Sequence, residues 1–142
     1  MNKTEVIEHF SELGFTLEEI PDYAYIFHYE DLNMLYMPDD EDNDFFRIAL
    51  PNIYDVTEEN RAFLLDVANE TNLMIKSAKI CLTHDDVWAM YECPIFSEDK
   101  IENMIQYAAE LLQAASALFI RNLNGEGFGN EEDNNDEKQN DK

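Results

Sequence analysis

Residues 23–50 decide the predicted fold, and they read YAYIFHYEDLNMLYMPDDEDNDFFRIAL. Aromatic and branched side chains alternate with others along three short runs, and acidic turns at residues 30–31 and 38–44 separate the runs. A period of two residues is typical of β-strands. The stretch therefore predicts three antiparallel strands joined as a meander.

Helical patterns surround this meander. Residues 3–13 carry apolar side chains at helical spacing after Asn2 and Glu5, which resemble a capping box. Further helices are expected over residues 57–71 and 98–122, with strands over residues 74–83 and 87–93 between them. The sequence thus predicts an α+β fold in the order α-β-β-β-α-β-β-α, with one antiparallel sheet and helices packed on it.

Two polar segments are expected to start the later helices. Asp55 followed by Glu58 favours a capped start for the second helix, and Ser97 favours one for the third. The third helix is apolar around most of its circumference over residues 108–120, which indicates burial on two sides. One side is the sheet, and the other could be the first helix or a second copy of the protein.

The composition predicts one domain and a tail. The chain has 142 residues, of which 45% are hydrophobic and 12% aromatic, enough for one hydrophobic core. Residues 124–142 contain no aliphatic side chain, so their burial cannot offset the entropy of ordering them. We expect a chaperone-like α+β domain over residues 1–123 and a disordered acidic tail over residues 124–142.

The net charge excludes whole classes of partner. The 32 acidic and 9 basic residues give a formal charge of −23, which repels phosphate backbones and anionic lipids. Nucleic acid and membranes are therefore not expected as partners. The first residues lack a signal-peptide pattern, and no apolar run approaches the roughly 20 residues of a membrane span, so a soluble cytoplasmic protein is expected. An acidic mimic of nucleic acid remains an alternative.

The strand pattern predicts which side chains share a face. A turn at residues 30–31 places Phe27 opposite Met34, and we align the third strand with Tyr36 opposite Phe46. A turn at residues 84–85 likewise places Cys81 opposite Trp88. The aromatic face is then the core, and the other face collects a mixed set of side chains: Ile26, His28, Leu35, Met37, Phe45, Arg47, Trp88 and Met90.

This second face is the predicted binding site. Large apolar side chains on an outer sheet face would form an exposed patch, and such patches mark interaction sites. The partner would be a protein or peptide client, or a second copy in a homodimer. Two alternatives stay open: the third helix or the tail could cover the face, and a register error of one residue would exchange the two faces.

No motif indicates catalysis, a metal site or a cofactor. His9, His28 and His84 lie in different elements without zinc-site spacing, and Cys81 and Cys93 are too far apart in the second hairpin for a disulfide. Acidic residues 39–44 lack the turn glycine and final Glu of a calcium loop. We expect a non-enzymatic binding module. The alternative is a small-ligand-binding sensory regulator with a pocket between sheet and helices, anchored by His28, Asn33 and Arg47.

Several features together resemble a known family. They are the element order, the first helix ending in Leu13-Gly14-Phe15, the aromatic meander, Tyr54-Asp55-Val56 before the second helix, and the long closing helix. This pattern resembles the YbjN-like branch of the type III secretion chaperone-like fold. The resemblance implies a small acidic α+β protein, commonly dimeric, that binds proteins or regulates without catalysis. Secretion chaperones of this fold hold unfolded effector segments on apolar patches, and the resemblance supplies no catalytic residue.

Overall fold

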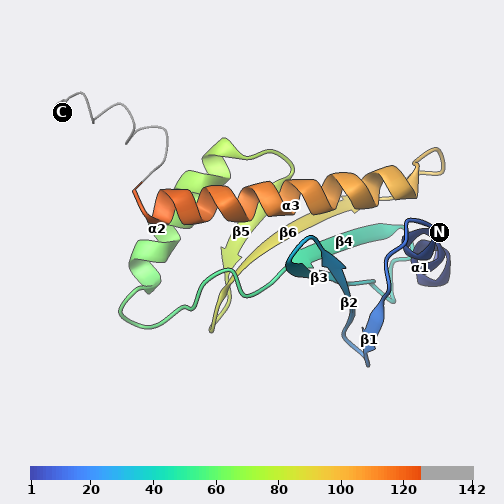
Figure 1. Cartoon of the computed structure of the whole chain (residues 1–142), viewed down its shortest axis with the longest axis horizontal. Helices are drawn as coiled ribbons and strands as arrows, with labels where there is room; N and C mark the ends of the chain where they lie inside the picture. The colour runs from blue at the N-terminus through green and yellow to red at the C-terminus, as the bar shows by residue number, and fades with distance from the viewer. Residues whose placement is uncertain (126–142) are drawn as a thin grey trace.

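The structure is a computed structural model that describes residues 1–125. Residues 126–142 lie outside the described residues, and with them nearly all of the predicted acidic tail. The elements follow one another as α1 (Lys3–Glu12), β1 (Glu18–Ile20), β2 (Ala24–Tyr29), β3 (Leu32–Tyr36), β4 (Phe45–Leu50), α2 (Arg61–Met74), β5 (Ala78–Leu82), β6 (Val87–Pro94) and α3 (Ile101–Leu123). α3 lies along the sheet. α1 lies near the first residues of α3, and α2 lies near its last residues (Figure 1).

The predicted α+β class and element order are confirmed, with one addition. β1 is a short edge strand of three residues that pairs with β2, opposite Ala24 to Ile26. Its sequence, Glu18-Glu19-Ile20, is too short to show an alternating pattern. Periodicity therefore does not predict this strand.

The strands of residues 1–125 form a single antiparallel sheet in the order β1-β2-β3-β4-β6-β5. Both predicted hairpins have the expected register, with Phe27 opposite Met34 and Cys81 opposite Trp88. Tyr36 pairs with Ile48, not with Phe46 as predicted. The faces are still those predicted, because a shift of two residues keeps every side chain on its side of the sheet.

The helices cover one face of the sheet. Phe27, Met34, Phe46 and Ile48 on that face are inaccessible to solvent, as are Ile105, Leu112 and Phe119 of α3. Phe10 of α1 joins this core through three aromatic contacts. The ring centroids lie 4.9 Å from Phe27, 5.3 Å from Tyr36 and 6.1 Å from Phe15. These contacts fix α1 on the edge half of the sheet.

Helix starts follow local hydrogen bonds. The capping box at α1 is confirmed: the Glu5 amide donates to Asn2 Oδ1 at 3.0 Å, and the Asn2 amide donates to Glu5 Oε1 at 2.9 Å. The capped start predicted near Asp55 and Glu58 is wrong, since α2 begins only at Arg61. Thr57 and Asn60 exchange backbone-to-side-chain hydrogen bonds of 2.7 and 3.2 Å, which hold residues 57–60 in a turn.

The start predicted at Ser97 for the last helix is also wrong. The Phe96 amide donates to Asp99 Oδ2 at 2.7 Å, and α3 begins two residues later at Ile101. The Asp99 side chain therefore satisfies backbone in the preceding turn. Such a turn competes with the first helical turn for the same polar groups.

The outer edge of β5 is blocked by a side chain of α2. Asn72 Oδ1 accepts a hydrogen bond from the Ile80 amide at 2.7 Å, and Asn72 Nδ2 donates to the Ile80 carbonyl at 3.0 Å. The amide thus takes the place of a neighbouring strand at one residue. An unpaired strand edge is a site of unwanted association, so this contact protects the sheet as well as stabilising it.

Replacing Asn72 by Ala is therefore expected to lower the free energy of unfolding by about 1–2 kcal/mol, because both Ile80 groups lose their partner. Urea denaturation followed by circular dichroism measures the change. Asn69→Ala, at an exposed position of the same helix, is the matched control because it makes the same change in helix propensity. Equal stabilities of the two variants would contradict a stabilising role for the Asn72 contact.

Within residues 1–125, every helix is too short or too polar to pass through a lipid bilayer.

Candidate functional site

A second hydrophobic cluster lies on the face of the sheet opposite the helices. Ala24, Leu35 and Ala49 are buried there, although no helix of residues 1–125 contributes to this cluster. Side chains of the sheet itself cover them, and these neighbours are half-buried: Ile20, Ile26, Met37, Trp88 and Met90. We call the surface formed by these eight residues the open face.

The structure places the predicted binding residues on one side of the sheet. Ile26, Leu35, Met37, Trp88 and Met90 belong to the open face itself. Phe45 and Arg47 extend the same side of β4, and the Arg47 guanidinium carbon lies 5.0 Å from the centroid of the Phe45 ring. His28 is exposed further along β2, opposite Asn33.

The expected exposed patch is more closely packed than the sequence predicted. Leu35 is only 6% exposed, so it forms the floor of the open face and offers little surface to a partner. Ile26, Met37 and Met90 around it are half-buried. Packing within the sheet explains why the patch is less exposed than predicted. On one face of a sheet, each side chain contacts its neighbours on the adjacent strands, and these contacts cover part of its surface.

A strip of charged side chains borders the open face. Arg47 Nε donates to Glu92 Oε2 at 2.8 Å, and Lys79 Nζ lies 2.7 Å from Glu92 Oε1. The hydrogen bond from Lys79, together with that from Arg47, holds the pKa of the Glu92 carboxyl below its ordinary value. Glu92 therefore stays ionised between two cations, and the strip places positive charge on an otherwise acidic molecule.

Asp86 holds the indole of Trp88 in place. Its carboxylate accepts hydrogen bonds from Trp88 Nε1 at 2.9 Å, from Thr83 Oγ1 at 2.6 Å and from the Asn52 amide at 2.9 Å. The polar edge of Trp88 is thus satisfied within the protein, and its rings pack with the open face. Asp86 is not among the residues predicted from the sequence, although Thr83 and Asp86 have the three-residue spacing of a side-chain-to-backbone turn.

The cysteine side chains are free thiols, as expected. Burial raises the pKa of Cys81, and it also raises the pKa of Cys93. A thiol with a raised pKa has little thiolate at neutral pH, and the thiolate is the nucleophile. The surroundings of these residues thus favour a packing role.

Surface hollows lie mostly away from the predicted binding residues. A hollow of about 220 Å³ between the start of α1 and the loop after β3 includes only Phe45 of them. Another of about 280 Å³ lies by Asn33, Asn52 and Ser116. Both are open to solvent, whereas a small-molecule site normally encloses most of its ligand. These hollows do not favour the ligand-binding alternative.

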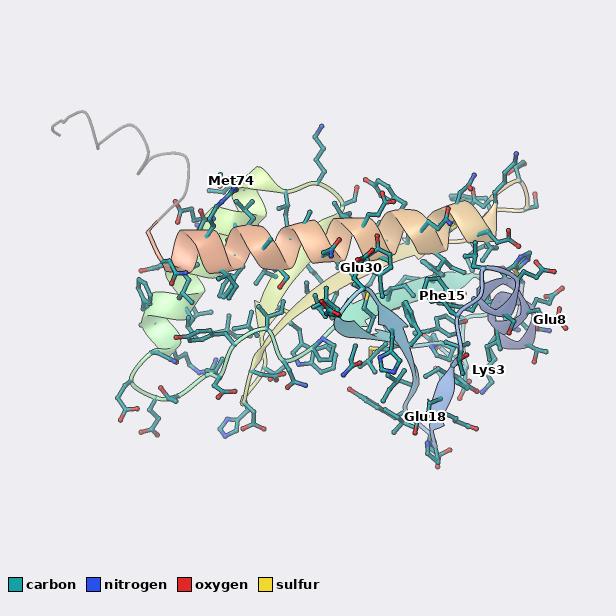
Figure 2. The ribbon with its side chains drawn as sticks, in the orientation of Figure 1. Lys3, Glu8, Phe15, Glu18, Glu30 and Met74 are labelled. Atoms are coloured by element: carbon teal, nitrogen blue, oxygen red, sulfur yellow. The ribbon has the colours of Figure 1, made fainter. Side chains whose placement is uncertain are left out.

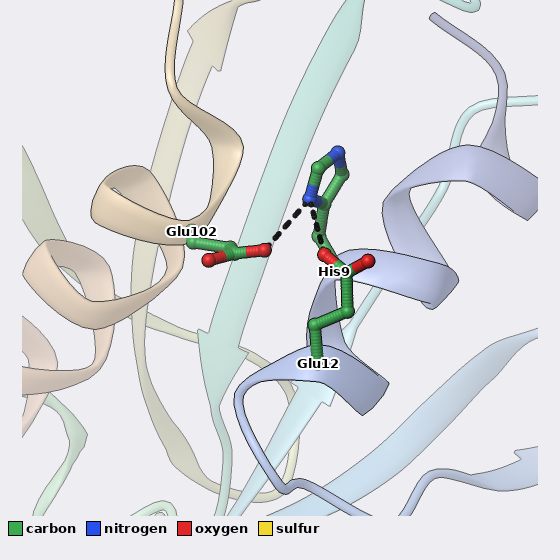
Figure 3. A group of neighbouring side chains, drawn as sticks. All are labelled: His9, Glu12 and Glu102. Atoms are coloured by element: carbon green, nitrogen blue, oxygen red, sulfur yellow. Dashed lines mark hydrogen bonds and ion pairs between the residues drawn. The ribbon is translucent and has the colours of Figure 1, made fainter.

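A cluster of three titratable side chains joins α1 to α3. His9 Nδ1 lies 3.1 Å from Glu102 Oε2 and 3.3 Å from Glu12 Oε1 (Figure 3). Glu102 raises the pKa of the Glu12 carboxyl, while hydrogen bonds from Glu12 and His9 lower the pKa of Glu102. The sequence shows the spacing of His9 and Glu12, but nothing in it places Glu102 beside them.

Comparisons with known proteins identify the fold. No protein-family model and no curated protein sequence matches the chain. Among solved structures, the chain is similar to YbjN, a proposed transcription regulator from E. coli, with a TM-score of 0.65 and 11% identity over 87% of this chain and 93% of that one. It is also similar to an uncharacterised protein of Methanothermobacter thermautotrophicus, with a TM-score of 0.57 and 14% identity over 87% and 97% of the two chains. At these identities the likeness concerns the fold, and this chain has the YbjN-like fold predicted from its sequence.

Proposed function

We propose that the chain is a non-enzymatic protein-binding module that takes an apolar segment of a partner protein on its open face. The observation that carries the proposal is a second apolar cluster, with Leu35 buried at its floor, on the side of the sheet that no helix of residues 1–125 covers. When a partner covers half-buried apolar side chains, the free energy of the complex falls by about 25 cal/mol per Å² of apolar surface removed from water.

The charges define the chemistry of the partner. With a net charge of −23, the protein as a whole attracts basic segments and repels acidic ones, while the Arg47–Glu92–Lys79 strip beside the open face carries a local charge of +1. An apolar segment flanked by Lys or Arg therefore fits better than a second copy, whose own negative charge would have to be overcome. Such a role is chaperone-like or regulatory. The description of YbjN as a proposed transcription regulator is compatible with it.

The make-up of the open face supports the non-enzymatic part of the proposal. The open face consists of apolar side chains, and it is bordered by the Arg47–Glu92–Lys79 strip, in which both cations pair with one carboxylate. A general base or nucleophile needs a reactive group within reach of a substrate, and the eight residues of the open face carry no carboxylate, imidazole, hydroxyl or thiol. Binding is the chemistry that this surface offers.

Met90→Glu tests the proposal. Met90 lies opposite Ala49 and Lys79 in the sheet, so the variant places a carboxylate in the open face. The probe is a synthetic peptide of alternating Leu and Lys, titrated while the emission of Trp88, the single tryptophan, is recorded. We expect a shift of the emission to shorter wavelengths with the wild type, and binding at least about tenfold weaker with Met90→Glu, a loss of about 1.4 kcal/mol.

Leu73→Glu is the matched control, because it adds the same charge at a position of α2 that is 80% exposed. It should bind the peptide as the wild type does. Sedimentation velocity on all three proteins distinguishes the occupants: a wild-type dimer that Met90→Glu dissociates would make the partner a second copy. Equal peptide affinity of Met90→Glu and Leu73→Glu, or a wild type that neither binds the peptide nor self-associates, would refute the proposal.

A further inference from the structure

The packing of two helices sets the positions of His9, Glu12 and Glu102. His9 precedes Phe10, which is inaccessible to solvent in the aromatic core, and Glu102 follows Ile101, which is 2% exposed. Each of these side chains therefore projects from backbone that the core holds in place. Glu12 follows His9 by three residues on α1, so the two lie on one side of the helix. Figure 3 shows the three side chains converging between α1 and α3.

Two of the three donor-atom separations have the length found in the first coordination shell of a small cation. The imidazole Nδ1 lies 3.1 and 3.3 Å from the two carboxylate oxygens, and one donor atom from each residue falls within 4.8 Å of the others. Zinc is bound at about 2.0–2.2 Å by nitrogen and oxygen, so two ligands of a tetrahedral site are about 3.3 Å apart. The His9 contacts therefore have the length of ligand-to-ligand separations.

The cluster brings two carboxylates to one imidazole nitrogen. A single ring nitrogen carries at most one proton, yet two carboxylates approach the same Nδ1 atom. Among the ion pairs of residues 1–125, neither Glu12 nor Glu102 has a Lys or Arg partner. A divalent cation would satisfy all three groups at once, and the net charge of −23 concentrates cations at the surface.

We propose that His9, Glu12 and Glu102 form a binding site for a divalent transition metal ion of the zinc type. The imidazole nitrogen favours zinc and its neighbours over Mg²⁺ and Ca²⁺, which prefer oxygen ligands throughout. Glu12 is exposed, so water completes the coordination on the solvent side. Bound metal connects α1 to α3, which are 93 residues apart at this contact, and it stabilises the folded chain. This site is separate from the open face.

Zinc titration of the full chain tests the site. Isothermal calorimetry gives the affinity, and thermal unfolding with and without ZnCl₂ gives the stabilisation. We expect the unfolding midpoint of the wild type to rise with Zn²⁺ and not with the same concentration of Mg²⁺. His9→Gln and Glu102→Gln should bind Zn²⁺ at least about tenfold more weakly and lose the rise in midpoint. Circular dichroism without metal checks that both variants are folded.

Two control variants separate this site from general attraction to an acidic surface. Glu8→Gln removes a carboxylate that points outward from α1 (Figure 2), and His84→Gln removes an imidazole that is 96% exposed. Both should respond to Zn²⁺ as the wild type does. In long-range ¹H–¹⁵N spectra, Zn²⁺ should shift the Nδ1 resonance of His9. If His9→Gln and the wild type respond equally to Zn²⁺, or if Mg²⁺ produces the same stabilisation, the cluster is an ion-pair network and the proposal is wrong.

Discussion

Replacing Phe10 by Ala is expected to lower the free energy of unfolding by about 3–5 kcal/mol. The Phe10 side chain is inaccessible to solvent, and its ring contacts those of Phe15, Phe27 and Tyr36. Truncation removes these aromatic contacts and leaves a cavity between α1 and the sheet, which the surrounding rings can fill only in part. Urea denaturation followed by circular dichroism measures the loss.

Phe63→Ala is the control for this change, because Phe63 lies on α2 and is 54% exposed. Its cost should be about 1 kcal/mol or less. Similar losses for the two variants would mean that the aromatic cluster does not hold α1 in place. Because His9 precedes Phe10, loosening α1 should also separate His9 from Glu102 and weaken the response to Zn²⁺.

Asp86→Ala is expected to lower the free energy of unfolding by about 2–4 kcal/mol. The Asp86 side chain accepts hydrogen bonds from Trp88 Nε1, Thr83 Oγ1 and the Asn52 amide, and the residue is 9% exposed. Its removal leaves Trp88 Nε1 and the Asn52 amide without a partner in a place that water reaches poorly, while Thr83 Oγ1 keeps the backbone carbonyl of residue 86 at 3.1 Å. Chemical denaturation measures the loss.

Asp85→Ala, at the position before Asp86, is the matched control. The Asp85 side chain is 89% exposed, and its replacement removes only a contact of 4.0 Å with His84. Its effect should stay within about 0.5 kcal/mol. Asp86→Ala should also shift the emission of Trp88 to longer wavelengths, because the indole is released from its hydrogen bond. Unchanged emission together with unchanged stability would show that Asp86 does not fix Trp88.

The register of the two hairpins could be predicted because the turns are short. With a two-residue turn at Glu30 and Asp31, every cross-strand pair of β2 and β3 follows by counting, and the same holds for Cys81 and Trp88. Alternation then assigns the faces. The pairing of β3 with β4 could not be counted, because the loop between them is long, and the predicted partner of Tyr36 was wrong by two residues.

Helix starts depended on hydrogen bonds that the sequence only suggests. Asn2 and Glu5 form the predicted box, yet Thr57 with Asn60 and Asp99 with Phe96 use equally good side-chain acceptors to hold turns outside the helices. A helix cap and a turn outside a helix both use such side-chain oxygens as acceptors for backbone amides. Local sequence therefore does not decide which of them wins.

The sequence by itself determined the α+β class, the element order, the strand faces and the acidic surface, because periodicity, turn length and charge are local properties. Only the tertiary structure decided that Leu35 is buried on the open face, that Asn72 blocks the edge of β5, and that Glu102 meets His9. Each of these depends on groups far apart in the chain or on neighbouring strands. Their distances are set by how the helices and strands pack, and no local pattern contains that information.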